Sequence, residues 1–276
     1  MRTTLVASSA LAVALVGQAA AADLPVAPAY RPAPVLIGYN WNGVYVGANV
    51  GWSGAQSNVS WTPNLTAFPV DGTAIAAASA NRLTSNSVTG GAQAGYNWQA
   101  GNFLAGLEGD ISFMGNNATF VTSPLVGIAG TSLSESAQMN WLVTVRPRIG
   151  YVWDNWLFYA TGGWAFGKVT FTDAVVSNLT IPGPPVVNLL DPIGTTFQRD
   201  KSGYAAGAGF EYGIAGGWSA KLEYLYVNLG SVNGFMGPGA APSRLITANH
   251  DMVDHIVRVG INYRFGGDRE VVVKYP

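Results

Sequence analysis

The sequence predicts an all-β protein, an eight-stranded antiparallel up-and-down transmembrane barrel with short periplasmic turns and long extracellular loops. Three observations predict this fold. Apolar and polar residues alternate with a period of two in eight stretches of about 11 to 13 residues, the strand length of membrane barrels. Short and long connections alternate between these stretches, and a secretory signal precedes them. Strands in ordinary soluble proteins run nearer 5 or 6 residues.

The composition excludes several other classes of protein. The chain has 276 residues, a formal net charge of −1, 11% charged residues and no cysteine. A nucleic-acid-binding protein would carry a clustered excess of Lys and Arg, so no nucleic-acid partner is expected. Without cysteine there is no disulfide framework and no thiolate metal site. The 49% of hydrophobic residues and the low net charge also differ from the signature of intrinsic disorder.

The first 22 residues predict export. A short positive start at Arg2 is followed by the apolar run Leu5–Val16 and by small residues that end at Ala22. This is the pattern of a cleaved signal peptide, and the apolar run is too short for a transmembrane anchor. The predicted organisation is a signal peptide (1–22), a Pro/Ala-rich periplasmic segment (23–40), the barrel (41–265) and a C-terminal tail (266–276).

Seven of the predicted strands place apolar residues on the outward face and polar or small residues on the inward face. The stretch Trp156–Thr170 is apolar on both faces, so its phase is taken from the two-residue link at 154–155, which places Trp153 and Trp156 on the same face. Links of two or three residues follow the second, fourth and sixth strands, at 100–102, 154–155 and 215–217. The other connections run to roughly 20 to 35 residues and are expected outside the cell. The eight predicted strands are Trp41–Ser53, Ser87–Gln99, Phe103–Met114, Gln138–Trp153, Trp156–Thr170, Ser202–Ile214, Trp218–Asn228 and His255–Phe265.

Aromatic residues gather at the strand ends next to the short links. Rings of aromatic side chains at both interfaces are typical of outer-membrane barrels. A soluble barrel of lipocalin type also alternates, but it turns its apolar face inward. The sequence therefore predicts lipid outside. The predicted interface aromatics are Trp41, Trp98, Phe103, Trp153, Trp156, Trp218 and Phe265.

Charged residues fall on the predicted inward face. An eight-stranded barrel is just wide enough for its own side chains, which favours a polar core closed by paired charges. The alternative is a small porin-like channel for ions or small hydrophilic solutes, lined by the same groups. The predicted interior charges are Glu108, Asp110, Arg146, Arg148, Glu211, Lys221, Glu223, Arg258 and Arg264.

Little in the sequence favours catalysis. Of the two histidines, His250 falls in the last predicted long loop, near Asp251 and Asp254, and His255 falls on the outward face of the last strand. Their spacing matches no metal-binding motif. Glu135, one of the few charged residues outside the strand cores, falls in the second predicted long loop. We expect no enzyme activity, no metal site and no cofactor, and we expect any ligand to bind through the loops.

Four stretches of the chain resemble a known family. They are Trp41–Gly51, Tyr159–Gly167, Trp218–Tyr226 and His255–Phe265. They look like the small porin-family outer-membrane proteins of alphaproteobacteria, the 25- and 31-kilodalton surface barrels, and the resemblance extends over nearly the whole chain from Trp41.

The resemblance implies a Gram-negative integral outer-membrane barrel that contributes to envelope integrity and surface interactions. It implies outer-membrane lipid and lipopolysaccharide as partners, and the barrel-assembly machinery during biogenesis, which would read a terminal aromatic residue here matched by Phe265. Haem binding is reported for some members of the family, but this chain offers no haem-ligand pattern. The tail beyond Phe265 departs from the family, whose members commonly stop at that aromatic residue. Either Phe265 remains the signal or Tyr275 replaces it, and the lack of alternation at 271–273 favours a periplasmic tail.

Overall fold

The computed structural model describes residues 38–65, 72–122, 132–176, 179–181, 187–189, 193–236 and 246–266. The predicted signal peptide, most of the Pro/Ala-rich segment and the tail beyond Gly266 lie outside these residues. No helix among the described residues is long and apolar enough to cross a membrane.

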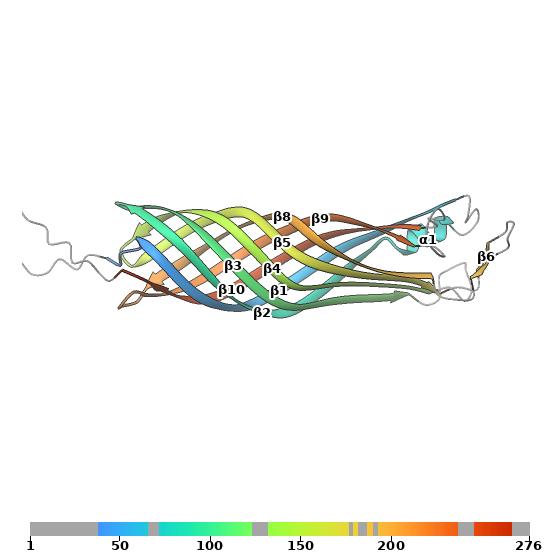
Figure 1. The fold of residues 1–276 in the computed structure, drawn as a ribbon, viewed down its shortest axis with the longest axis horizontal. Coiled ribbons are helices and arrows are strands. Elements are labelled where there is room, and N and C mark those ends of the chain that lie inside the picture. The colour runs from blue at the N-terminus through green and yellow to red at the C-terminus, as the bar shows by residue number, and fades with distance from the viewer. Residues whose placement is uncertain are drawn as a thin grey trace, which may run out of the picture. The chain divides into compact units, whose positions relative to one another are not determined.

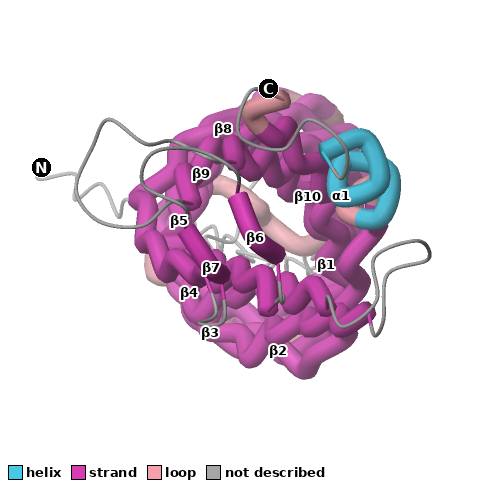
Figure 2. The backbone as a smooth tube through the Cα atoms, turned by 90° about the vertical axis from the view of Figure 1, so that its right-hand side faces the viewer, coloured by secondary structure: helices cyan, strands magenta, loops and turns pink. Residues whose placement is uncertain are grey.

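Eight long antiparallel strands close into a barrel, with the first strand β1 paired to the last strand β10 (Figure 1). Seen along its axis, the wall is a continuous ring of strands (Figure 2). Helix α1 (Gly72–Ala78) follows β1, and β6 (Leu179–Ile181) pairs with β7 (Val187–Leu189) in a separate small sheet. The barrel strands are β1 (Gly43–Pro63), β2 (Asn81–Ala100), β3 (Phe103–Thr122), β4 (Ser132–Trp153), β5 (Trp156–Val176), β8 (Ile193–Gly213), β9 (Trp218–Met236) and β10 (Ile246–Arg264).

The predicted eight-stranded fold is confirmed, but the strands are longer than predicted. They contain 19 to 22 residues each. The long connections are correspondingly shorter: 123–131 separates β3 from β4, and 237–245 separates β9 from β10. The three short connections lie where the sequence predicts them, at 101–102, 154–155 and 214–217.

The outward face of each strand carries an apolar band that ends abruptly. Trp52 is the last large apolar residue on the outward face of β1, before Gln56 and Asn58. From Phe103 to Phe113 is ten steps along β3, which at about 3.3 Å each and a tilt near 40° project to about 25 Å, the height of the apolar band of such barrels. The last large apolar residues of this band on the eight strands are Trp52, Val88, Phe113, Trp141, Phe166, Tyr204, Tyr226 and Val253. Farther along β3 and β9, Val121 and Phe235 are isolated exposed apolar residues.

Beyond this band the alternation inverts, because the inward face becomes apolar and the outward face mostly polar. We call this part the outer module; on β1 it comprises Ala55–Pro63. Its core includes Phe171, Phe197, Leu133 and Met139, and Ile75 of α1 packs into it. The outer module is therefore built like a soluble protein, with its polar surface in water.

The wall of the outer module consists of two sheets rather than a continuous ring. Paired residues between β2 and β3 extend only to Thr89 and Met114, and those between β8 and β9 only to Tyr204 and Asn228. Above these levels β9–β10–β1–β2 and β3–β4–β5–β8 face each other as two four-stranded sheets across the apolar core.

Two bulges shift the inward and outward phase where the outer module begins. In β4 the register slips between Met139 and Leu142, so Met139 is buried inside and Asn140 is exposed. The sequence places these two side chains the other way round, and that prediction is wrong. In β9 a similar slip occurs at Leu229 and Gly230, where Gly230 has a φ of 70°. An extra residue in a strand of period two moves every later side chain to the opposite face.

Candidate functional site

The lumen gathers the chemically interesting side chains of this protein, and its periplasmic mouth is closed by Tyr39 and Trp41. The Tyr39 hydroxyl donates to the Gly217 carbonyl oxygen at 2.7 Å, and its backbone N–H donates to Asn155 Oδ1 at 2.9 Å. The Trp41 backbone N–H donates to Gln99 Oε1 at 2.9 Å. Because these partners come from three different places around the rim, the segment crosses the mouth.

Trp41 is therefore not an interface aromatic, and its prediction as one is wrong. Its side chain is only 2% exposed and packs inside the barrel. The reason is the path of the segment, since Trp41 precedes β1 and crosses the mouth, where Gln99 holds its backbone N–H. The small apolar cluster at this mouth consists of Tyr39, Trp41, Leu104, Val152, Leu157 and Tyr159.

The other predicted interface aromatics project outward at the periplasmic edge. Trp156 contacts Tyr212 with 4.8 Å between ring centroids, and Trp218 contacts Tyr263 at 5.1 Å. Their exposed fractions range from 37% at Trp156 to 70% at Phe103. The six residues are Trp98, Phe103, Trp153, Trp156, Trp218 and Phe265.

A second aromatic ring marks the other edge of the apolar band. Its members are outward-facing and lie where the polar outer module begins, and they are not among the aromatic residues that the sequence predicts at the interface. The switch of the outward face from apolar to polar would have revealed them. They are Trp52, Phe113, Trp141, Phe166, Tyr204 and Tyr226.

Above the mouth, the lumen is filled by a cluster of buried charges with Arg146 at its centre. The guanidinium of Arg146 lies 2.9 Å from Glu108, 2.8 Å from Asp110 and 3.2 Å from Glu223, and its side chain is fully buried. Thr144 also accepts a hydrogen bond from Arg146 Nε at 2.9 Å. Arg146 thus holds three carboxylates from two strands.

The remaining ion pairs extend this cluster across the lumen. Four carboxylates are matched by four cations, so the cluster carries no net charge when every group is ionised. Such pairing is what makes buried charge tolerable. The other close pairs are Arg258 with Asp110 (2.9 Å) and Glu223 (2.6 Å), Lys221 with Glu108 (3.0 Å), and Arg148 with Glu211 (2.7 Å).

Two tyrosines complete the hydrogen bonding of the cluster from the mouth side. Tyr45 donates to Glu108 at 2.7 Å, and Tyr159 donates to Glu223 at 3.1 Å. The Arg148 guanidinium lies over the Tyr45 ring, 4.7 Å from its centroid. The structure places all nine predicted interior charges inside the barrel, with Arg264 nearer the mouth, 5.5 Å from the Tyr39 ring centroid.

A third closing layer is the apolar core of the outer module, which encloses a few polar groups. His250 Nε2 lies 2.9 Å from Asp173 Oδ2, and the His250 ring stacks on Phe171 with 4.2 Å between centroids. Glu135 lies opposite Asp173 in the β4–β5 register. Beyond the membrane band, burial raises the pKa of Glu135 to about 8, and the nearby charge of Asp173 adds to that rise.

The placement of these polar groups in loops is therefore wrong. His250 and Asp254 lie in β10 and Glu135 lies in β4, and all three side chains face inward and are at most 1% exposed. Asp254 accepts hydrogen bonds from Ser53 at 2.7 and 2.8 Å. The strands continue past the membrane band with inverted polarity, so the alternation expected of membrane strands does not identify them. His255 does face outward, where its Nδ1 lies 2.7 Å from the Tyr224 hydroxyl.

Among the residues that the structure describes, no group of three or more acidic or histidine side chains is arranged to hold a metal ion. The arrangement in the lumen instead fills the interior of the barrel with side chains. Three successive layers, an aromatic mouth, a neutral charge cluster and an apolar core, leave the interior occupied by the chain's own side chains.

Comparisons with known proteins found both sequences and structures that are similar to this chain. Residues 8–265 match the family described as outer membrane protein beta-barrel domain. The 31 kDa outer-membrane immunogenic protein of Brucella melitensis is 31% identical over 96% of this chain and 100% of its own length. The 22 kDa outer membrane protein of Rhizobium leguminosarum is 26% identical over 62% of this chain and 63% of its own. The solved structure of OprG from Pseudomonas aeruginosa is 12% identical, covers 82% of this chain and 98% of its own, and has a TM-score of 0.43.

Proposed function

This chain belongs to the outer membrane beta-barrel family and is an integral outer-membrane protein, and from that premise we propose that it is a structural and surface-interaction barrel with a closed lumen, contributing to envelope integrity. The observation that carries the proposal is the charge cluster around Arg146, whose members are all buried. A conducting pore needs hydrated charges, whereas these are paired with one another. This pairing disfavours the alternative of a small diffusion channel.

The outer module gives the barrel a surface for contacts outside the membrane. Its outward residues on β4 are small and polar, Ser134, Ser136, Gln138 and Asn140 among them. Hydroxyl and amide groups of this kind hydrogen-bond to sugars as well as to water. We therefore assign lipopolysaccharide as the surrounding partner of the outer module, and phospholipid as the partner of the apolar band.

Biogenesis is proposed to depend on Phe265. Its backbone N–H donates to the Val44 carbonyl oxygen at 2.8 Å, which extends the pairing of β10 with β1 by one residue. Its side chain is 50% exposed at the periplasmic edge. Phe265 is thus the terminal aromatic residue of the closing strand, and we propose it as the signal for the barrel-assembly machinery.

A deletion strain tests the function. We expect loss of this protein to raise sensitivity to bile-salt detergents, and the wild-type gene to restore resistance. We also expect the uptake rate of a small hydrophilic solute to be the same in both strains. Slower solute uptake in the deletion strain, with unchanged detergent resistance, would overturn the proposal in favour of the channel.

A further inference from the structure

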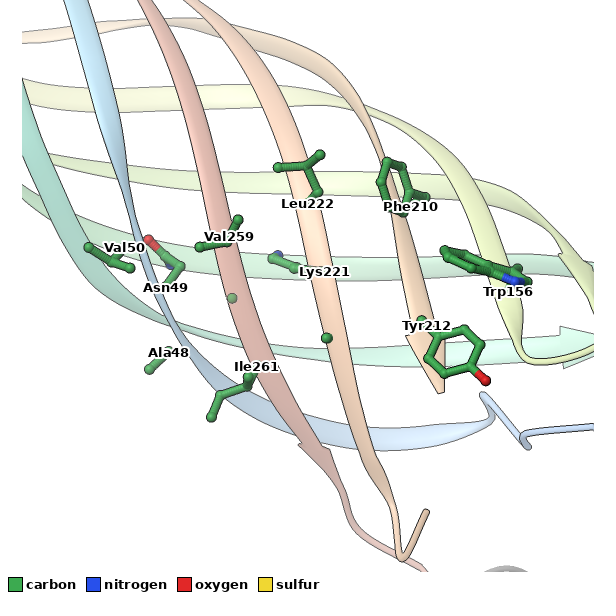
Figure 3. Close-up of a pocket in the computed structure, with 12 residues that line it drawn as sticks. Ala48, Asn49, Val50, Trp156, Phe210, Tyr212, Lys221, Leu222, Val259 and Ile261 are labelled. Atoms are coloured by element: carbon green, nitrogen blue, oxygen red, sulfur yellow. The ribbon is translucent and has the colours of Figure 1, made fainter. Parts of the chain in front are cut away.

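The lipid-facing wall carries a groove that the closed-lumen function does not use. It has a volume of about 730 Å³ and crosses strands β5, β8, β9, β10 and β1 on their outward faces. Figure 3 shows Trp156, Phe210 and Tyr212 at one end of the groove and Ala48 and Val50 at the other (Figure 3). Its outward-facing lining is almost entirely apolar.

The strand register explains how the groove forms. Five outward residues lie side by side in one row across the wall, because Trp156 pairs with Tyr212, Tyr212 with Ala220, Ala220 with Ile261 and Ile261 with Ala48. Ala220 and Ala48 are small, so the row is low at these two places. The next row up forms a taller wall, consisting of Phe210, Leu222, Val259 and Val50.

The same register shows that the groove climbs from the membrane surface into the bilayer. Trp156 is the first residue of β5 and Tyr212 the last but one of β8, both beside periplasmic turns. Ala220 is the third residue of β9, and Ala48 the sixth of β1. Each step across the wall therefore moves deeper into the apolar band. Four strand spacings of about 4.8 Å make the groove about 19 Å long.

The aromatic end of the groove has the chemistry of a membrane interface. Trp156 packs against Tyr212 and Phe210, with ring centroids 4.8 and 5.8 Å away, so the three rings support one another. Trp and Tyr place an apolar ring in the hydrocarbon and an N–H or O–H donor toward the polar headgroups. Phosphate and ester oxygens of a phospholipid are acceptors for such donors.

We propose that this groove holds one acyl chain of a phospholipid of the periplasmic leaflet, whose headgroup lies at Trp156 and Tyr212. The groove begins at the periplasmic membrane interface and runs from there into the apolar band, where acyl chains are the solvent. An unfilled groove would leave the side chains of its walls without contact partners. An acyl chain is narrow and flexible, so it can follow the diagonal course of the groove across the strands. The convex wall of a second barrel would contact only the edges of the groove and would leave its floor empty.

The test is the retention of lipid by single-residue variants. The full-length mature protein is reconstituted in vesicles of phosphatidylethanolamine and phosphatidylglycerol, extracted in mild detergent and analysed by native mass spectrometry. In Ala220→Phe a ring fills the low point of the groove. Ala105→Phe is the matched control, because Ala105 is the third residue of β3, also faces outward and follows a short turn.

We expect wild type and the Ala105→Phe variant to retain one phospholipid, and Ala220→Phe to lower the retained fraction by about tenfold. Folding of each variant is checked by its heat-dependent mobility on gels. Ala48→Phe, at the deep end of the groove, repeats the test should Ala220→Phe fail to fold. Equal retention by wild type and a folded groove variant would overturn the proposal. So would a protein dimer that the groove variants abolish, because a second copy would then occupy the groove.

Discussion

Arg146 provides the sharpest test of the charge cluster, because it contacts three carboxylates while fully buried. Arg146→Met keeps much of the side-chain volume and removes the charge. The cluster then holds four carboxylates and three cations, so one negative charge is buried without compensation. Removing one partner of a buried ion pair costs about 3–5 kcal/mol. We expect the free energy of unfolding to fall by about that amount.

The assay is urea unfolding of the refolded barrel in detergent micelles, followed by gel mobility and tryptophan fluorescence. Arg199→Met is the control, since Arg199 is exposed on β8, and we expect it to change stability by no more than about 0.5 kcal/mol.

A second substitution tests whether the loss of stability comes from the uncompensated charge. Glu223→Gln restores equal numbers of acids and bases in the Arg146→Met background. The double variant is therefore expected to be more stable than the sum of the two single changes implies, by about 0.5–3 kcal/mol. Additive losses, or an Arg146→Met variant as stable as wild type, would refute the compensated cluster.

Three further outcomes are expected. The wild-type chain has no cysteine, so a membrane-impermeant maleimide on intact cells should label Asn140→Cys and leave Met139→Cys unlabelled; the reverse would contradict the bulge in β4. Because the pKa of Glu135 is raised to about 8, the folded chain keeps this carboxyl protonated up to about pH 8, whereas the unfolded chain loses the proton above about pH 4.3. Stability should thus fall from that pH to about pH 8, and Glu135→Gln should lessen the fall, measured by urea midpoints at pH 5 and pH 9; an unchanged slope would refute the assignment. Trp41→Ala should lower stability by about 3–5 kcal/mol without opening a conducting path, and current steps from this variant would show that the mouth alone blocks the lumen.

The membrane band of the barrel could be predicted from the sequence because lipid imposes a simple rule on it. Outward side chains there are almost all apolar, so residues such as Val257, Val259 and Ile261 alternate with Arg258 and Asn262. The phase of each strand then places the charges inside. Close packing in a narrow lumen brings them together without any further signal in the sequence.

The outer module could not be found by the same rule, because its polarity is inverted. In Ser132–Gln138 the serines face out and Leu133, Glu135 and Ala137 face in, a pattern that belongs to soluble sheets. The bulges at Met139 and Gly230 also interrupt the alternation where the environment changes. A single unpaired residue resets the phase, and its position depends on contacts between strands.

His250 and Trp41 show how tertiary context decides a side chain's role. The partner of His250 is Asp173, 77 residues earlier in the chain, and nothing in the local sequence points to that pairing. Trp41 lies next to the outward aromatic pattern, but the crossing of the mouth, fixed by Gln99 and by the Tyr39 contacts with Asn155, turns it inward.

The closed lumen is tested most directly by the electrical conductance of the folded barrel in a planar lipid bilayer, compared with that of Arg146→Ala/Arg148→Ala. The wild-type barrel, with its heat-dependent gel mobility as proof of folding, should produce no steady current steps, because its charges are paired and its two ends are packed. Reproducible steps from the wild-type barrel, changed in size by the double substitution, would establish a charge-lined pore and contradict the closed lumen.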